Sequence, residues 1–247
     1  GKIMEYYGQP DLTDPLFSSF TNAFVMMGCV ILLCLLLSTI AIKPKRIVNK
    51  VQKQALAIKD RLLTPRFVIF FIAGMLLQVS FGPYYGFFVL FLRDLTYSGF
   101  TVGLLISLGV VAEILVFIFS SHFFKYFSLK ALLIFSLAAT SFRWLLVALY
   151  AESIWLLAFT QLMHAASFAL FHSASMLFIS NHFTSCQQSR GQAVYLGGVY
   201  GVGGAIGAYV AGAFWLDGLG ASTAFLTASA AALLAAMVML FLPKQVI

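Results

Sequence analysis

The 247-residue chain is 62% hydrophobic and only 9% charged, with a formal net charge of +7 and a mean hydropathy of +0.98. Because soluble domains carry about a quarter charged residues, this composition excludes an ordinary soluble domain and predicts an all-α, multi-pass membrane protein. The positive charge does not indicate a nucleic-acid partner. Eight Lys or Arg residues lie with one Asp between Lys43 and Arg66, a pattern typical of a cytoplasmic loop.

The segments outside the apolar spans contain no sequence motif that indicates a metal or cofactor site. The cysteines are Cys29, Cys34 and Cys186, an odd number that does not form a disulfide framework. We find no zinc-ligand spacing, phosphate-binding loop or dinucleotide fingerprint there. We therefore expect no metal, no cofactor and no enzymatic activity.

Polar residues 1–21 lead into the first of seven predicted membrane-spanning helices. These spans cover residues 22–42, 67–92, 101–121, 130–150, 154–178, 191–216 and 221–242, and each is long enough to cross a bilayer. With residues 43–66 in the cytoplasm, twelve basic residues lie inside and two outside, a strong positive-inside bias. The sequence thus predicts a protein of the cytoplasmic (inner) membrane with a cytoplasmic C-terminus.

The basic segment 43–66 has a pattern of its own. Ile47, Val51, Ile58 and Leu62 recur at helical spacing, and the basic residues fall on another side. An amphipathic helix on the anionic cytoplasmic leaflet has this pattern. A solvated basic linker also fits the charge.

The second span, 67–92, is interrupted at Gly82-Pro83 and carries several polar side chains. Proline kinks a membrane helix and frees backbone groups that protein or water must satisfy. Gln78, Gly82 and Tyr85 share one face at helical periodicity, and Tyr84 is adjacent. A broken helix with amide and phenol groups suits a solute cavity, whereas a structural kink with interfacial tyrosines is the alternative.

Two charged residues lie deep in the third and fourth spans. Glu113 falls within about 3 Å of the centre of its span, where an ionised carboxylate needs a partner, water or a proton. Arg143 lies about 4–5 Å outward of the centre of the next span. From there its guanidinium could also snorkel, that is, extend to the membrane interface. The two are offset by about 7–8 Å along the membrane normal, a distance that an arginine side chain, with a bridging water, can cover.

The fifth span carries a stripe of polar and aromatic side chains. Gln161, His164, Phe168, His172 and Ser175 fall within about 80° of one another on a helical wheel. A single histidine often makes a helix contact, but two histidines on one face with an amide and an aromatic ring favour a cavity. His164, near the midpoint of the span, is expected to relay a proton or to hydrogen-bond the solute.

The sixth span is rich in glycine. Gly197/Gly201 and Gly203/Gly207 form GxxxG pairs, which let helices approach closely. We therefore expect this span to be chiefly structural.

Four segments resemble the major facilitator superfamily, in particular its phenylpropionate permease and nucleoside–proton symporter-like branch. They are GPYYGFF (82–88), GVVAEILVF (109–117), SFRWLL (141–146) and QLMHAASFALFH (161–172). Lactose-permease-like sugar symporters show a similar Glu, Arg, His order on three successive helices. In those proteins a carboxylate follows the histidine by three residues, whereas this chain has Ser167.

The resemblance implies a twelve-helix transporter made of two six-helix halves joined by a basic cytoplasmic loop. On this basis residues 1–42 are an outer loop and helix six, 43–66 the loop between the halves, and 67–247 the C-terminal six-helix half. Most of the N-terminal half, expected as a partner of this chain, would then be absent from it.

The hypothesis that follows is proton-coupled symport of a small organic solute by alternating access. Glu113, Arg143 and His164 are the expected proton-coupling residues. The expected cavity residues are Gln78, Tyr84, Tyr85, Gln161, Phe168 and His172, which suit an aromatic acid, a nucleoside or a sugar. A static buried ion pair is the alternative for Glu113 and Arg143. A seven-span receptor, or an intramembrane hydrolase using Ser222, is the alternative for the whole chain.

Overall fold

The computed structural model describes residues 26, 28–30, 32–34, 36–37 and 58–243. The chain divides into two units, Gly1–Lys53 and Gln54–Ile247. The described residues of the first unit are helical. Most of the expected span 22–42 and most of the basic loop 43–66 lie outside the described residues.

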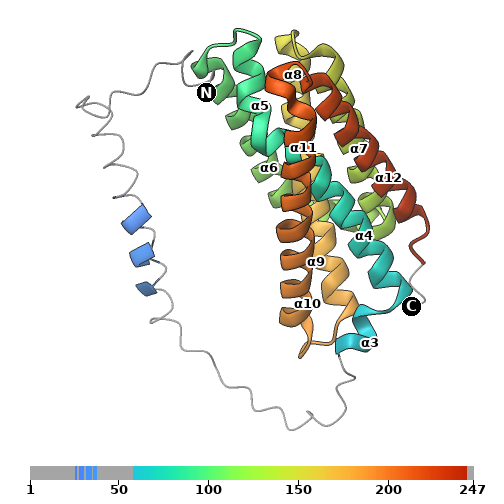
Figure 1. Ribbon diagram of the computed structural model, residues 1–247. Coiled ribbons are helices and arrows are strands. Elements are labelled where there is room, and N and C mark those ends of the chain that lie inside the picture. The colour runs from blue at the N-terminus through green and yellow to red at the C-terminus, as the bar shows by residue number, and fades with distance from the viewer. Residues whose placement is uncertain (1–25, 27, 31, 35, 38–57, 244–247) are drawn as a thin grey trace. The chain divides into compact units, whose positions relative to one another are not determined.

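The second unit is a bundle of helices (Figure 1). Its elements are α3 (Ile58–Leu62), α4 (Pro65–Ser80), α5 (Gly82–Asp94), α6 (Gly99–Tyr126), α7 (Leu129–Tyr150), α8 (Ile154–Ala165), η2 (Ala166–Leu170), α9 (Phe171–His182), α10 (Gln188–Tyr195), η3 (Leu196–Gly203), α11 (Gly204–Trp215), η4 (Leu216–Gly218) and α12 (Ala221–Leu240). No strand occurs in residues 58–243. The prediction of an all-α protein is confirmed for this part of the chain.

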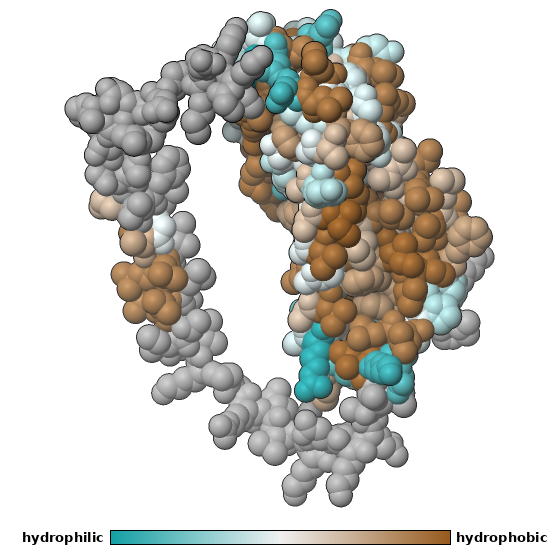
Figure 2. All heavy atoms as spheres, in the orientation of Figure 1, coloured by the Kyte–Doolittle hydropathy of each residue, from teal (hydrophilic) through white to brown (hydrophobic). Residues whose placement is uncertain are grey.

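Among the described residues, six helical runs are long and apolar enough to cross a membrane. They cover Pro65–Asp94, Gly99–Tyr126, Leu129–Tyr150, Ile154–His182, Gln188–Gly218 and Ala221–Leu240. These runs match the last six predicted spans. Figure 2 shows apolar side chains over most of the visible length of the bundle and hydrophilic ones near its ends, the distribution that a bilayer requires.

Four of these runs begin at a hydroxyl residue that caps the first turn. Thr64, Ser98, Ser128 and Ser153 each accept a hydrogen bond from the backbone N–H three residues later. Such caps satisfy one of the unpaired N–H groups that every helix start leaves. Short polar residues before apolar runs therefore fix where these spans begin.

The second span breaks at Phe81, as Gly82-Pro83 predicts. Glycine is required there because a Cβ at Gly82 would lie 2.1 Å from the carbonyl oxygen of Gly207, and a Cβ at Gly207 would lie 2.6 Å from that of Val79. The backbones of the broken helix and of α11 therefore touch. Gly203 packs on α4 in the same way, but a Cβ at Gly197 would meet nothing within 4 Å. Of the two predicted glycine pairs, only the second lies at this contact.

The core lies where α7 and α12 pack against α4 and α5. Trp144, Phe81, Phe88 and Phe225 are almost fully buried in it. By contrast, α6 buries only Val102, Leu105 and Gly109. Ile106 and Phe124 are partly buried against the core, and most other apolar side chains of α6 are exposed.

Candidate functional site

Glu113, Arg143 and His164 come together in the interior of the bundle, from α6, α7 and α8. His164 Nε2 lies 2.5 Å from Glu113 Oε1, and His164 Nδ1 lies 2.6 Å from Arg143 Nη1. The three side chains thus form one continuous chain, which we call the Arg–His–Glu chain. Its imidazole takes the place where a direct or water-bridged contact between arginine and glutamate was expected.

The donors in this chain determine where the histidine proton sits. A guanidinium only donates hydrogen bonds, so His164 Nδ1 accepts from Arg143. The ring proton is then on Nε2 and is donated to the Glu113 carboxylate. In this tautomer His164 is neutral and joins the guanidinium of Arg143 to the carboxyl group of Glu113.

Arg143 is completely buried. Its guanidinium carbon lies 4.5 Å from the ring centroid of Tyr84 and 4.3 Å from that of Trp144, so cation–π attraction replaces part of its lost hydration. Within the described part of the chain, Nε and Nη2 make no hydrogen bond. The expected alternative of snorkelling is therefore wrong for this conformation, and the N–H groups of two nitrogen atoms remain for another acceptor.

Tyr84 and Gln161 adjoin the Arg–His–Glu chain. The Tyr84 hydroxyl donates a 3.0 Å hydrogen bond to Gln161 Oε1, and the rings of Tyr84 and His164 are 5.2 Å apart. A Cβ at Gly109 would lie 3.5 Å from both Gln161 Oε1 and His164 Cδ2. These are ordinary van der Waals distances, so α6 packs against α8 at Gly109, one turn before Glu113.

The other four expected cavity residues are distributed differently. Tyr85 is 57% exposed and stacks on Phe81. Gln78 is buried and packs against Gly203 on η3. Gln78 is therefore buried and Tyr85 exposed, on either side of the turn at Phe81.

Phe168 and His172 continue the stripe of the fifth span. Phe168 stacks on His164, with ring centroids 5.8 Å apart, and on His172, at 6.1 Å. His172 Nδ1 lies 3.1 Å from the hydroxyl of Tyr200 on η3. The predicted stripe is therefore continuous. Toward its C-terminal end, however, His172 contacts the glycine-rich span rather than the Arg–His–Glu chain.

The residues that sequence reasoning missed are Trp144, Tyr195 and Tyr200. Trp144 flanks Arg143 in the sequence, and its Nε1 donates to Ser80 Oγ at 3.1 Å. Tyr195 and Tyr200 are five residues apart, far apart on an α-helical wheel, yet their rings are 5.8 Å apart. The π-helical turns of η3 bring them together, because residues five apart are neighbours only in a π-helix.

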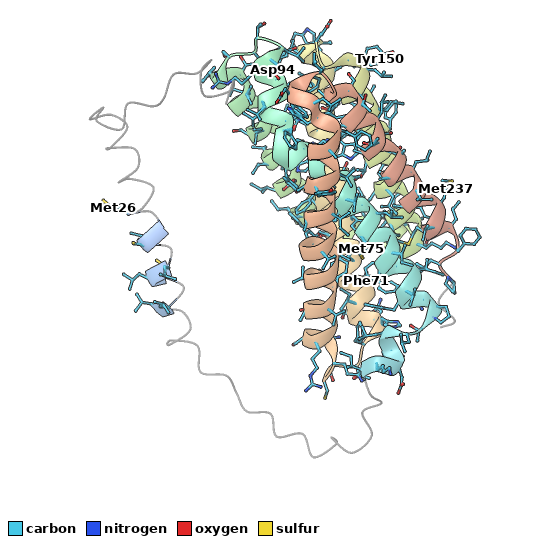
Figure 3. The ribbon with its side chains drawn as sticks, in the orientation of Figure 1. Met26, Phe71, Met75, Asp94, Tyr150 and Met237 are labelled. Carbon is cyan, nitrogen blue, oxygen red and sulfur yellow. The ribbon has the colours of Figure 1, made fainter. Side chains whose placement is uncertain are left out.

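Apolar cavities lined by described residues lie away from this site. One of about 60 Å³ lies beside Gly207 and Pro83, and one of about 180 Å³ is lined by residues that include Phe67 and Phe71. Figure 3 labels Phe71 and Met75 on α4, and Asp94 and Tyr150 at the far end of the bundle. Neither cavity is lined by a member of the Arg–His–Glu chain.

Comparison with known proteins places the chain in a family of transporters. Residues 1–227 match the MFS_1 like family. The chain belongs to this family. Major facilitator proteins are transporters rather than enzymes, so the intramembrane hydrolase interpretation is excluded and the receptor interpretation loses its support.

Two individual proteins resemble this MFS chain. The probable 3-phenylpropionic acid transporter of Escherichia coli (strain K12) is 35% identical over 120 residues, which are 49% of this chain and 31% of that protein. The crystal structure of the nucleoside transporter NupG, in a mutant form, superposes with a TM-score of 0.67 at 18% identity, over 88% of this chain and 60% of that one. The matched parts thus amount to about a third and three fifths of the two relatives.

Proposed function

We propose that this MFS chain belongs to a proton-coupled symporter that moves a small organic solute across the cytoplasmic membrane by alternating access. The observation that carries the proposal is the Arg–His–Glu chain, in which His164 joins a buried cation to a carboxylate. Ionisable groups at this depth are costly and are typical of proton pathways.

In this mechanism Glu113 carries the coupling proton. While it is ionised, it accepts from His164 and draws the Arg–His–Glu chain together. Protonation removes the negative charge, weakens the hydrogen bond and releases His164 and Arg143 to other partners. The free donors Nε and Nη2 of Arg143 suit an acceptor that arrives in the opposite conformation.

Phe168, Tyr84 and Gln161 are proposed to line the solute path, with Tyr85 and Gln78 farther from the Arg–His–Glu chain. Aromatic rings and a guanidinium suit an aromatic carboxylate, the class of solute for which the 35% identical relative is named. An aromatic monocarboxylate is therefore the first solute to test, before nucleosides and sugars.

The arrangement of the chain follows from the same proposal. Residues 67–247 would form the C-terminal six-helix half, with 43–66 as the cytoplasmic loop between halves and 1–42 as an outer loop and helix six. The N-terminal half would supply the opposing wall of the solute cavity. Experiments on transport therefore use the complete twelve-helix protein that contains this chain.

The deciding experiment compares Glu113→Gln with the wild type in proteoliposomes. We expect proton-driven accumulation to be lost while exchange of labelled for unlabelled solute continues, because exchange needs no net proton movement. Glu152→Gln, at an exposed carboxylate in the loop between α7 and α8, is the matched control. A well-folded Glu113→Gln protein with normal accumulation would refute the coupling role. Equal loss of both activities would instead support a static pair that fixes helix packing.

A further inference from the structure

A second group of polar side chains lies between α9, α10 and η3, outside the Arg–His–Glu chain. It consists of His172, Ser175, Tyr195 and Tyr200, which we call the inner polar cluster. His172 Nδ1 lies 3.1 Å from the Tyr200 hydroxyl. The Tyr195 and Tyr200 rings are 5.8 Å apart, and Ser175 lies on α9 three residues after His172.

Two hydroxyl groups of this cluster are buried and unsatisfied. Tyr195 and Ser175 are both 0% exposed, and neither Tyr195 Oη nor Ser175 Oγ makes a hydrogen bond of standard geometry within residues 58–243. An unsatisfied buried hydroxyl costs about 1–3 kcal/mol. Two such groups beside a histidine–tyrosine hydrogen bond are the setting in which proteins hold an ordered water, which needs two to four polar partners.

The position of the cluster relates it to the Arg–His–Glu chain. His172 lies eight residues after His164, a rise of about 12 Å toward the end of the fifth span. That end is the cytoplasmic one by loop charge. The Phe168 ring stacks between the two imidazoles, so a proton that leaves the Arg–His–Glu chain toward the cytoplasm must pass this level.

Three neighbouring elements surround the His172 ring. From α6, Phe117 packs against it, with Glu113 one helical turn away along the same helix. From η2 it contacts Phe168, and from η3 it contacts Tyr200. Glu113 is thus the nearest carboxylate on α6, and within residues 58–243 no salt bridge neutralises His172 permanently.

We propose that the inner polar cluster is a hydrated station that passes the coupling proton between the Arg–His–Glu chain and the cytoplasm. This inference rests on the proposed proton-coupled function. It assigns His172 to the proton path instead of to the solute cavity, and gives roles to Tyr195, Tyr200 and Ser175.

The transfer conserves protons at each step. A hydronium ion delivers one proton to His172 Nε2 and becomes water, while the Nδ1 proton passes to the Tyr200 oxygen and the Tyr200 proton passes to a second water, which becomes hydronium. One proton enters, one leaves, and the imidazole is neutral before and after. Tyr195 and Ser175 hold the receiving water. The imidazole of His172 then returns to its starting tautomer and can accept the next proton.

The experiment measures solute uptake by the complete transporter in proteoliposomes, with and without a proton gradient. The variants are His172→Phe, which removes the titrating ring, and Tyr200→Phe, which removes one oxygen atom and leaves packing intact. The matched controls are His122→Phe and Tyr209→Phe, at side chains exposed on the helix surface. The probe is the solute that the wild type accumulates, with deuterated water as a second condition.

We expect both cluster variants to slow proton-driven uptake about tenfold or more, the order of a lost acid–base group. Solute exchange without net proton movement should remain within a factor of two, and the controls should match the wild type. Normal proton-driven uptake by folded Tyr200→Phe and His172→Phe proteins would overturn the inference. So would an equal loss of exchange, which would mark the cluster as a solute contact or a packing element.

Glu113→Gln, measured in parallel, separates this inference from the proposed function. If Glu113→Gln loses accumulation while the cluster variants keep it, proton coupling stands and the inner polar cluster has no part in it. If Glu113→Gln accumulates solute normally, the coupling proposal itself fails, and this inference fails with it.

Discussion

Replacing His164 by leucine should destabilise the protein much more than replacing it by glutamine. His164 is 6% exposed and makes two short hydrogen bonds, 2.6 Å to Arg143 and 2.5 Å to Glu113. Leucine removes both bonds. Glutamine offers one acceptor and one donor separated by about 2.2 Å, the separation of the two ring nitrogens, and can bridge the same partners.

The size of the difference follows from the geometry. Two short contacts and the width of an imidazole place the Arg143 and Glu113 charges about 7 Å apart, where Coulomb's law with an effective dielectric constant of 20 gives about 2–2.5 kcal/mol. Leucine keeps most of that attraction but leaves a buried guanidinium with no hydrogen bond in the described part of the chain. Removing the partner of a buried charge costs about 3–5 kcal/mol, whereas the glutamine bridge should cost about 1 kcal/mol.

Thermal unfolding of the purified complete protein in detergent measures this difference. At about 2–4 °C for each kcal/mol in a domain of this size, His164→Leu should unfold several degrees below His164→Gln. His122→Leu, at an exposed position on α6, is the control for loss of a histidine. A His164→Leu protein as stable as the wild type would refute the reasoning, because the buried guanidinium would then not depend on His164.

The same two variants test whether His164 only bridges. Glutamine restores hydrogen bonds but cannot take up a proton. If His164 relays the coupling proton, a stable His164→Gln protein loses proton-driven accumulation. If His164 only positions Arg143 and Glu113, that protein still accumulates solute.

Other parts of the fold lead to three more predictions. Gly82→Ala should lower the unfolding temperature, because its Cβ would lie 2.1 Å from a facing carbonyl oxygen. Gly86→Ala is the control, because its Cβ would meet nothing within 4 Å. Equal unfolding temperatures for the two variants would contradict this prediction. The pKa of Tyr97 is raised by burial and by Glu152, so its contribution to stability is present below its unfolded pKa of about 10 and is lost as pH rises through the folded pKa. Thermal unfolding should therefore show a steeper alkaline loss of stability for the wild type than for Tyr97→Phe. In a cysteine-free protein, an impermeant thiol reagent added outside should label a cysteine at Glu152 and not one at Lys125; the reverse would overturn the orientation.

The sequence by itself determined the membrane-spanning architecture of the described part. Six apolar runs of sufficient length, hydroxyl residues before four of them and a Gly-Pro pair inside one are local signals, and each fixes a local feature of the backbone. Glu113, Arg143 and His164 also stood out in the sequence. Burying an ionisable group in a bilayer is so costly that its presence alone marks a candidate site.

Only the tertiary structure decided how these groups connect. The heights of Glu113 and Arg143 could be estimated from the rise of a helix, but the placement of His164 between them depends on how α6, α7 and α8 pack. Gln78 is buried and Tyr85 exposed on either side of the turn at Phe81, and Tyr195 meets Tyr200 through π-helical turns. Periodicity arguments assume an uninterrupted α-helix, so they fail where the backbone departs from one, and in this protein those departures lie beside its buried polar side chains.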